Sequence, residues 1–266
     1  MVTKKSVKLQ RMRGLKDKVA IVTGAGSGLG RGMAQRLAAE GVKVAIMDLN
    51  LAGAQETAAA ISGDGGIASA HEVDIADYAA CEAGVAAAEA EHGPVDVLVN
   101  NAGWDKAMPF LDTEPSLWRK IVDINLYGPL NMHHVVAPGM LARGGGKIIN
   151  IASDAGRVGS SGEAVYSACK GGVIAFGKTL SRELARKGVI VNTVCPGPSD
   201  TPLFADFAGE GEAGEKLRSA LERSIPMRRL GTADDIAGVV TFLASAEADF
   251  VVGQTISVSG GLTMHG

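Results

Sequence analysis

Short apolar runs rich in Val and Ile alternate along the chain with longer, Ala-rich stretches of helical composition. In runs such as VAIVT and VLVN the apolar residues are consecutive and do not alternate with polar ones. Consecutive apolar positions indicate strands buried on both faces, as in a parallel sheet covered by helices. The pattern predicts strands at 19–23, 42–48, 67–74, 95–103, 147–153, 189–197 and 254–261, and helices at 30–41, 52–62, 78–93, 115–143, 164–188 and 233–245.

Seven such strands separated by helices predict an α/β fold: a single doubly wound domain whose seven-stranded parallel sheet is flanked by helices on both faces. No linker-like break interrupts residues 15–266. The segment 198–226 is glycine-spotted, charged and flanked by prolines. Because it follows the sixth strand, we predict a mobile insertion over the carboxyl edge of the sheet, where ligands bind in such folds.

Charge changes this picture at the amino end. The chain has 26 Lys and Arg against 29 Asp and Glu, which leaves no broad basic field for nucleic acid. Residues 1–18 nevertheless hold seven Lys or Arg and one Asp, so residues 1–14 are predicted to be a basic, disordered tail. No apolar h-region follows it, and no apolar run approaches the ~18 residues of a membrane span. We therefore expect neither a targeting signal nor a membrane partner.

The metal-ligating residue types show no metal pattern. Cys81, Cys169 and Cys195 are odd in number and form no CxxC, which indicates free thiols in a reducing cytoplasm. His133 and His134 are adjacent, so on a helix they point to different sides. No metal site is predicted.

The stretch TGAGSGLG (23–30) joins the first predicted strand to the first helix. Its glycines allow a tight turn and a close approach to a pyrophosphate, and the following helix supplies N–H groups and a positive dipole end. A bare structural turn would have the same composition. The second strand, however, ends in Asp48, where a carboxylate accepts hydrogen bonds from ribose hydroxyls and repels a 2′-phosphate. The third ends in Asp74 and Ile75, placed to border the adenine. The domain is therefore predicted to be Rossmann-type and to bind NAD rather than NADP.

The glycine spacing TGxxxGxG, with NNAG at 100–103, Asn125, Ser153, YSACK at 166–170 and PG at 196–197, resembles the short-chain dehydrogenase/reductase family from about Leu15 to Gly261. The resemblance implies that Tyr166 is the acid/base and that Ser153 hydrogen-bonds the substrate oxygen. It also implies that Asn125 supports a water chain to Lys170. Lys170, one helical turn from Tyr166, places a cation near the phenol and is expected to favour phenolate. Singly, each residue has a structural explanation; together with the glycine loop they indicate hydride transfer.

The loop and the resemblance together give the expected cofactor site. One position departs from the family: Ser199 stands where a Val or Ile is usual, which puts the local conformation in doubt. The site is expected to consist of Gly24, Ser27, Gly28, Leu29, Gly30, Asp48, Leu49, Asp74, Ile75, Asn101, Ala102, Gly103, Ile151, Tyr166, Lys170, Pro196, Gly197, Ser199 and Thr201.

The substrate is less constrained than the chemistry. NNAGWD, the segment 150–172, VCPGPSDT and SVSGGLTMHG resemble family members that oxidise 2-hydroxycyclohexanecarboxyl-CoA, a ring β-hydroxyacyl-CoA, in anaerobic degradation of aromatic and alicyclic acids. Alternatives are another β-hydroxyacyl-CoA dehydrogenase, such as one for a hydroxybenzylsuccinyl-CoA, a 3-oxoacyl-carrier-protein reductase, or a non-catalytic NAD-binding member. A homotetramer is expected from the family. Candidate CoA-phosphate contacts are Lys106, Arg157, Arg228 and Arg229, and candidate apolar pocket residues are Trp104, Met108, Phe204, Phe207 and Met264.

Overall fold

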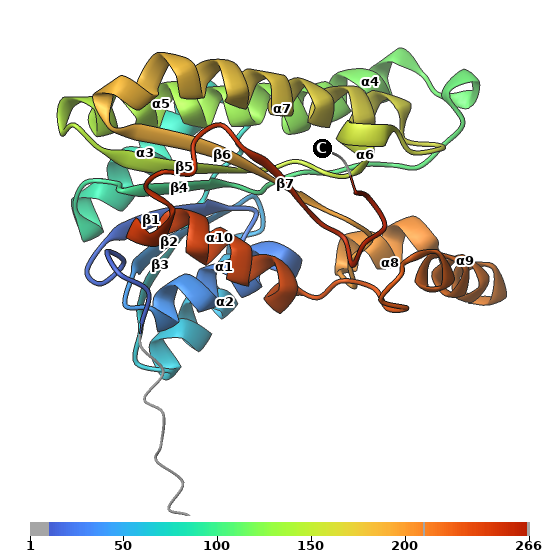
Figure 1. Ribbon diagram of the computed structural model, residues 1–266, viewed down its shortest axis with the longest axis horizontal. Coiled ribbons are helices and arrows are strands. Elements are labelled where there is room, and N and C mark those ends of the chain that lie inside the picture. The colour runs from blue at the N-terminus through green and yellow to red at the C-terminus, as the bar shows by residue number, and fades with distance from the viewer. Residues whose placement is uncertain (1–10, 210, 265–266) are drawn as a thin grey trace, which may run out of the picture.

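The computed structural model describes residues 11–209 and 211–264, and its centre is a parallel sheet of seven strands (Figure 1). The order across the sheet is β3-β2-β1-β4-β5-β6-β7, and every neighbouring pair is parallel. The predicted fold class is confirmed. The strands are β1 (Val19–Thr23), β2 (Lys43–Asp48), β3 (Ile67–Glu72), β4 (Val97–Asn100), β5 (Gly146–Ile151), β6 (Val189–Pro196) and β7 (Thr255–Val258).

Helices cover both faces of this sheet, as Figure 1 shows above and below the strands. The core on one face packs α1 (Gly28–Ala39), α2 (Leu51–Gly63) and α10 (Ala233–Ala244) against the strands. The core on the other face packs α3 (Tyr78–His92), α5 (Gly128–Ala142) and α7 (Ala164–Leu184).

Strand β4 shows why the apolar runs are continuous. Val97 and Val99 belong to the first core and Leu98 belongs to the second, and all three are almost completely buried. Successive side chains of a strand point to opposite faces, so a strand covered on both faces has no polar position to alternate with.

The helix predicted at 115–143 is three segments: α4 (Pro115–Val122), a π-helical turn η2 (Asp123–Tyr127) and α5. A π-helical turn inside a helix changes the direction of its side chains and occurs often at functional sites. Asn125 lies in this turn and is completely buried. Short 3₁₀ turns, η1 (Phe110–Asp112), η3 (Ala185–Lys187) and η4 (Ala246–Ala248), and the one-turn helix α6 (Ala155–Val158) complete the layers.

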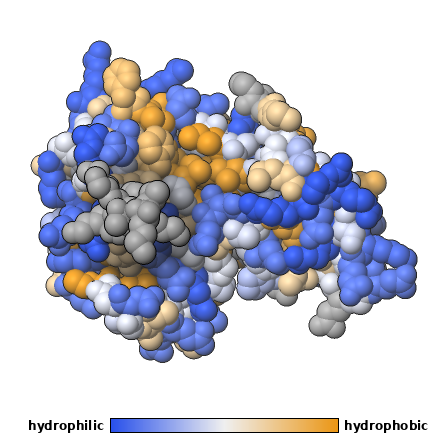
Figure 2. All heavy atoms as spheres, turned by 60° about the horizontal axis from the view of Figure 1, so that its bottom comes forward, coloured by the Kyte–Doolittle hydropathy of each residue, from blue (hydrophilic) through white to orange (hydrophobic). Residues whose placement is uncertain are grey.

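The predicted insertion 198–226 folds into two helices, α8 (Pro202–Ala208) and α9 (Gly211–Ser224), at the end of the molecule away from α3. The helix α9, with the sequence GEAGEKLRSALERS, lies at the outer edge, and Figure 2 shows this end of the molecule as mostly hydrophilic. A small apolar cluster of Phe204, Ile225 and Leu230 joins the insertion to the chain that follows it. The insertion is therefore a folded unit with its own small core.

Part of the predicted basic tail belongs to the domain. Residues 1–10 lie outside the described residues. The backbone N–H of Met12 donates to Glu40 Oε2 at 2.9 Å, and Arg13 bonds the carboxylate of Glu247 at two distances of 2.8 Å. The contacts of Met12 and Arg13 therefore lie before the predicted boundary at residue 15, where Leu15 is fully buried.

In the described ranges, no helix combines the length and the apolar composition needed to cross a bilayer.

Candidate active site

The glycine loop after β1 lies directly against the end of β4. Gly24 has a φ of +62°, and a Cβ on it would lie 2.7 Å from Ala102 Cα. A Cβ on Gly30 would lie 2.2 Å from the carbonyl oxygen of Gly24. Ser27 precedes α1 without a side-chain cap, so the first N–H groups of the helix lack that internal acceptor. Backbone N–H groups at such a helix start are suited to bind a pyrophosphate.

Thr23 and Asn101 tie the ends of these two strands together. Thr23 Oγ1 accepts the backbone N–H groups of Asn101 at 3.0 Å and of Ala102 at 3.1 Å. In return, Asn101 Nδ2 donates to the carbonyls of Thr23 at 2.9 Å and Gly24 at 3.0 Å. The side chain of Asn101 therefore fixes the glycine loop, a structural role that the motif NNAG did not reveal.

Asp48 lies where the sequence predicts it, beside the glycine loop. Its Oδ2 accepts the N–H of Gly26 at 2.8 Å, and its Oδ1 accepts the N–H of Asn50 at 2.8 Å. Arg31, the basic residue nearest the loop in sequence, donates to Thr57 Oγ1 at 2.9 Å and forms an ion pair with Glu56 at 3.0 Å. The Asp48 carboxylate therefore lies next to the glycine loop, and the guanidinium of Arg31 is paired with Glu56.

Asp74 and Ile75 lie further along the same edge. Asp74 Oδ1 caps its own turn by accepting the N–H of Ala76 at 2.9 Å. The side chain of Ile75 is 6% exposed and packs against Gly128, and its carbonyl accepts Asn131 Nδ2 at 2.9 Å. Packing against α5 therefore orients this pair. Leu49 is 67% exposed.

A cleft of about 480 Å³ opens at the carboxyl ends of β4, β5 and β6. It brings together predicted residues from five separate segments of the chain: Leu29, Asn101, Gly103, Ile151, Ser153, Tyr166, Lys170, Pro196, Gly197, Ser199 and Thr201. The other predicted residues lie outside its wall: Gly24, Ser27, Gly28, Gly30, Asp48, Leu49, Asp74, Ile75, Ala102 and Asn125.

Tyr166, Lys170 and Ser153 face one another across this cleft. Lys170 Nζ lies 5.4 Å from the centroid of the Tyr166 ring and donates to the carbonyl of Ile151 at 3.1 Å. Ser153 Oγ accepts the N–H of Ala155 at 3.1 Å and hydrogen-bonds the Tyr166 phenol. The three side chains can therefore contact one small group bound between Ser153 and Tyr166.

Burial dominates the proton affinities of the two titratable groups. It raises the pKa of Tyr166 above its usual 10, the charge of Glu163 adds to this, and the bond with Ser153 opposes it. Burial also lowers the pKa of Lys170 to about 8. The shift towards phenolate expected from Lys170 is therefore outweighed by burial, which raises the pKa of Tyr166 and which the spacing of YSACK does not reveal.

Asn125 is hydrogen-bonded behind the cleft, beside Gly103. Its Oδ1 accepts the N–H of Trp104 at 3.3 Å, and its Nδ2 donates to the carbonyls of Trp104 at 2.6 Å and Ile121 at 2.9 Å. A Cβ on Gly103 would lie 2.9 Å from Asn125 Oδ1 and 3.3 Å from Lys170 Nζ. A glycine at position 103 thus leaves the space between the amide and the ammonium open.

The loop after β6 is fixed by backbone pairing despite its unusual Ser199. Ser199 forms a β-bridge with Gly231, and the N–H of Gly231 donates to the carbonyl of Pro198 at 2.9 Å. Ser199 Oγ donates to the carbonyl of Gly197 at 2.9 Å, and Thr201 Oγ1 caps α8. The departure from the family pattern is therefore accommodated by a local hydrogen bond.

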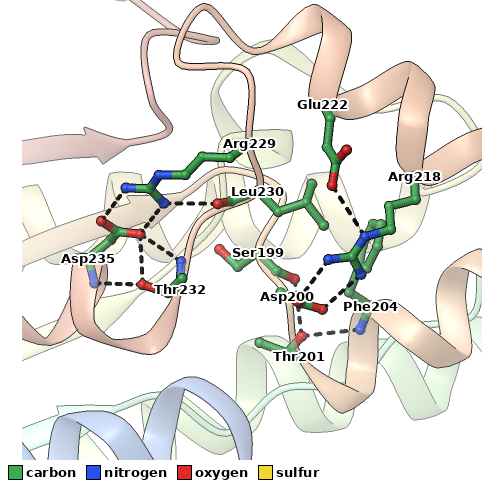
Figure 3. Close-up of polar contacts among 10 residues, drawn as sticks. All are labelled: Ser199, Asp200, Thr201, Phe204, Arg218, Glu222, Arg229, Leu230, Thr232 and Asp235. Atoms are coloured by element: carbon green, nitrogen blue, oxygen red, sulfur yellow. Dashed lines mark hydrogen bonds and ion pairs between the residues drawn. The ribbon is translucent and has the colours of Figure 1, made fainter.

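Figure 3 shows two ion pairs, one within the insertion and one just after it. Arg218 of α9 donates to both carboxylate oxygens of Asp200 at 2.9 and 2.8 Å and also contacts Glu222. Arg229 binds both carboxylate oxygens of Asp235, which forms the capping box of α10 with Thr232. The first pair therefore ties α9 to the start of the insertion, and the second ties the segment after the insertion to α10.

The wall of the cleft contains residues that sequence reasoning missed. Asp105 and Glu163 contribute carboxyl groups close to Tyr166. Both residues lie in segments that carry the family resemblance, NNAGWD and 150–172, but the sequence pattern predicts no role for either carboxyl group. The apolar part of the wall consists of Val158, Leu203, Phe204, Leu221 and Leu262.

The predicted apolar pocket is largely wrong. Only Phe204 of its described side chains lines the cleft; the Trp104 ring lies under Lys120 Nζ at 3.9 Å, and Met264 is 86% exposed. Met108 lines a separate small hollow, and the side chain of Phe207 lies outside the described parts. These positions are set by loop conformations that carry no periodic signal.

Of the predicted phosphate-binding cations, the guanidinium groups have contacts within the protein. Arg229 binds Asp235, Arg228 donates to the carbonyl of Arg223, and Arg157 donates to Ser257 Oγ at 3.0 Å. Lys106 is exposed. Among the described residues, no three metal-ligating side chains lie together.

Comparisons with known proteins agree with this geometry. A family profile described as enoyl-(acyl carrier protein) reductase matches residues 24–263. The acetoacetyl-CoA reductase of Shinella zoogloeoides is 42% identical over 246 residues, covering 92% of this chain and 98% of that protein. The galactitol 2-dehydrogenase of Agrobacterium fabrum is 42% identical over 254 residues, covering 93% and 98%. A crystal structure of 3-ketoacyl-(acyl-carrier-protein) reductase from Brucella melitensis complexed with NADH superposes with a TM-score of 0.85 at 36% identity, covering 94% of this chain and 100% of that one.

The burial of Lys170 predicts a stability cost. A pKa lowered from 10.5 to about 8 corresponds to about 3 kcal/mol against the charged form, so Lys170→Met is expected to raise the free energy of unfolding at pH 7 by up to that amount. Between pH 8 and 10.5 the folded chain has lost this proton while the unfolded chain keeps it, so the wild type gains stability and the difference shrinks. Urea unfolding at pH 7 and pH 10 measures both values.

The matched control is Lys178→Met, at an exposed position of the same helix, which is expected to change stability by less than about 0.5 kcal/mol. Equal stability of Lys170→Met and wild type at both pH values would contradict the prediction.

Proposed function

Because this chain belongs to the short-chain dehydrogenase/reductase family, we propose that it oxidises a secondary alcohol to a ketone with NAD. Its reaction class is that of an oxidoreductase acting on CH–OH groups. The observation that carries the proposal is that Ser153, Tyr166 and Lys170 line one cleft together with Leu29 from the glycine loop. We further propose that the alcohol is a β-hydroxyacyl-CoA such as 2-hydroxycyclohexanecarboxyl-CoA.

The residues of the cleft supply binding, orientation and proton transfer. The alcohol oxygen lies between Ser153 Oγ and the Tyr166 oxygen, so that Ser153 orients it and Tyr166 accepts its proton. The carbon–hydrogen bond of the carbinol breaks with both electrons, and the bound nicotinamide supplies the acceptor for this hydride. The ammonium of Lys170 donates to the Ile151 carbonyl and lies beside Gly103, which leaves room for it. From this position behind the phenol, its positive charge stabilises negative charge on the Tyr166 oxygen.

One observation favours the reverse direction as a second candidate function. An ordinary phenol is neutral near pH 7, and burial, which raises the pKa of Tyr166, favours that form further. A neutral phenol is the form that donates a proton to a ketone oxygen, as in reduction of a 3-oxoacyl thioester. The names of two similar proteins, an acetoacetyl-CoA reductase and a 3-ketoacyl-(acyl-carrier-protein) reductase, support this alternative.

The preference for NAD is supported by the surroundings of the glycine loop. The Asp48 carboxylate lies 2.8 Å from the Gly26 amide, and Arg31 is paired with Glu56. A 2′-phosphate there meets a negative charge and no unpaired guanidinium from the loop. The structure of one similar protein in complex with NADH supports this assignment.

The acyl-CoA assignment is supported by the shape of the cleft and by the relatives. Its apolar wall of Val158, Leu203 and Leu262 suits a ring or a short acyl chain. The relatives include both an acetoacetyl-CoA reductase and a galactitol 2-dehydrogenase, so thioester and polyol substrates are the two classes to separate. We also propose that the protein is a cytoplasmic homotetramer. Light scattering measures the mass of the assembly and so tests the tetramer.

Tyr166→Phe is expected to lower kcat for alcohol oxidation by a factor of about 10² to 10⁴, because the proton acceptor is removed. Binding of NAD, followed by quenching of protein fluorescence, is expected to persist. Tyr127→Phe, at a tyrosine that is 54% exposed, is the control and is expected to retain full activity. Turnover by Tyr166→Phe near the wild-type rate would exclude Tyr166 as the base.

For the cofactor, kcat/KM with NAD is expected to exceed that with NADP about tenfold, since one partly buried like-charge contact costs about 1.4 kcal/mol. Asp48→Asn is expected to reduce this ratio, whereas Asp64→Asn, at the exposed residue that follows α2, leaves it unchanged. Steady-state rates with both cofactors at one substrate concentration series give the ratio. Equal kcat/KM for the two cofactors in the wild type would overturn the assignment.

The substrate is tested with a panel of alcohols under NAD. We expect the highest kcat/KM with 2-hydroxycyclohexanecarboxyl-CoA, lower values with 3-hydroxybutyryl-CoA, and the lowest with simple secondary alcohols, galactitol and sorbitol. Formation of NADH is followed by its absorbance. Activity confined to the free alcohols or the polyols would remove the acyl-CoA hypothesis and leave the hydride chemistry in place.

A further inference from the structure

Two carboxyl groups from separate segments meet in the catalytic cleft. Asp105 follows β4 in the loop NNAGWD, and Glu163 immediately precedes α7, one turn before Tyr166. Both line the cleft that contains Ser153 and Tyr166. The mechanism of proton transfer uses neither of them.

The Asp105 carboxyl group is buried, and few contacts offset the free-energy cost of burying it. Each of its oxygens exposes less than 1 Å² and accepts no hydrogen bond of normal geometry from a described residue. The ion pairs found among the described residues involve neither Asp105 nor Glu163. The ammonium of Lys170 donates to the carbonyl of Ile151. A buried, unpaired carboxyl in a cleft is costly to the fold, which points to a role in what the cleft admits.

The charge state of the pair follows from this environment. Burial raises the pKa of Asp105 to about 6; the nearby Lys106 amide opposes the shift, the neighbouring Glu163 carboxyl adds to it, and the charge of Lys170 opposes it. Above pH 7 Asp105 therefore carries a negative charge beside Glu163 in the cleft. The charges of Glu163 and of Asp105 are also two of the causes that raise the pKa of Tyr166. Their field thus reaches the phenol oxygen, which is the atom that the reacting alcohol must contact.

We propose that Asp105 and Glu163 are specificity determinants that exclude hydroxy acids with a free carboxylate and admit neutral acyl derivatives of the same acids. The inference rests on the proposed function for the position of the reacting carbinol. In a β-hydroxy acid the carboxyl carbon is two bonds from the carbinol carbon, so an ionised carboxylate enters the field of the pair. In a thioester that position is uncharged, and the phosphates of CoA are separated from it by the whole pantetheine arm.

The experiment compares three compounds with the same carbinol: 3-hydroxybutyrate, its methyl ester and its N-acetylcysteamine thioester. For the wild type at pH 8, kcat/KM for the ester is expected to exceed that for the free acid at least a hundredfold. In the double variant Asp105→Asn with Glu163→Gln, the ratio of kcat/KM for the acid to kcat/KM for the ester is expected to rise at least tenfold, because any effect on Tyr166 is common to both compounds. Each single variant is expected to give part of the rise, and Glu82→Gln, an exposed position of α3, none.

A measurement on the wild type alone guards against misfolded variants. Lowering the pH from 8 to 6 protonates Asp105 in part but leaves 3-hydroxybutyrate ionised, so the acid-to-ester ratio of kcat/KM is expected to rise. The other groups that act on Asp105 are Glu163, the Lys106 amide, Lys170 and Cys169. Lys170 also gains a proton between pH 8 and 6 and attracts the ionised acid, so a rise no larger in the wild type than in Asp105→Asn would count against the inference.

Three outcomes would overturn the inference: a wild type that oxidises the acid as readily as the ester, a double variant that folds with an unchanged ratio, or a ratio that does not respond to pH. A wild type that oxidises the ester but no thioester, with the ratio behaving as expected, supports the charge filter and removes only the acyl-CoA part of the proposed function.

Discussion

The meeting of the carboxyl ends of β1 and β4 is the contact on which the site depends. The Thr23 hydroxyl accepts two backbone N–H groups of the NNAG segment, and Asn101 returns two bonds to the glycine loop. Gly24 allows the two backbones to approach within a distance that any side chain would prevent. From this junction the chain leads one way to the start of α1 and the other way to Gly103, which lies beside Lys170 of α7. Four hydrogen bonds between side chains and backbone therefore fix the glycine loop against the segment that borders Lys170.

Burying titratable groups in the cleft lowers the stability of the folded chain. Lys170, Asp105 and Tyr166 are titratable groups whose pKa values are all displaced chiefly by burial, in the direction that disfavours charge. A chain selected for stability alone would place apolar side chains at these positions. The apolar cores on the two faces of the sheet supply the stability that permits three displaced groups to share one cleft.

Sequence reasoning succeeded where a local pattern has a physical cause. Consecutive apolar residues such as those of β4 revealed a sheet covered on both faces, and the spacing of the glycines revealed the loop at the end of β1. It failed where the outcome depends on how distant segments pack. The π-helical turn at Asn125 is invisible in a helical pattern, Asp105 and Glu163 meet only in the folded chain, and Leu262 closes the cleft from a segment without periodicity. The proton affinity of Tyr166 was misjudged for the same reason, because a spacing of four residues does not specify burial.

The ion pair between Arg218 and Asp200 is open to water: the two side chains are 42% and 55% exposed. Ions screen such a pair within about 8 Å at physiological salt, whereas the buried groups beneath it are hardly affected. The helices α8 and α9 and the buried residues of the cleft therefore respond to different properties of the solution. Ionic strength acts on how firmly α9 is held over the substrate, and the acidity of the medium acts on the reaction below it.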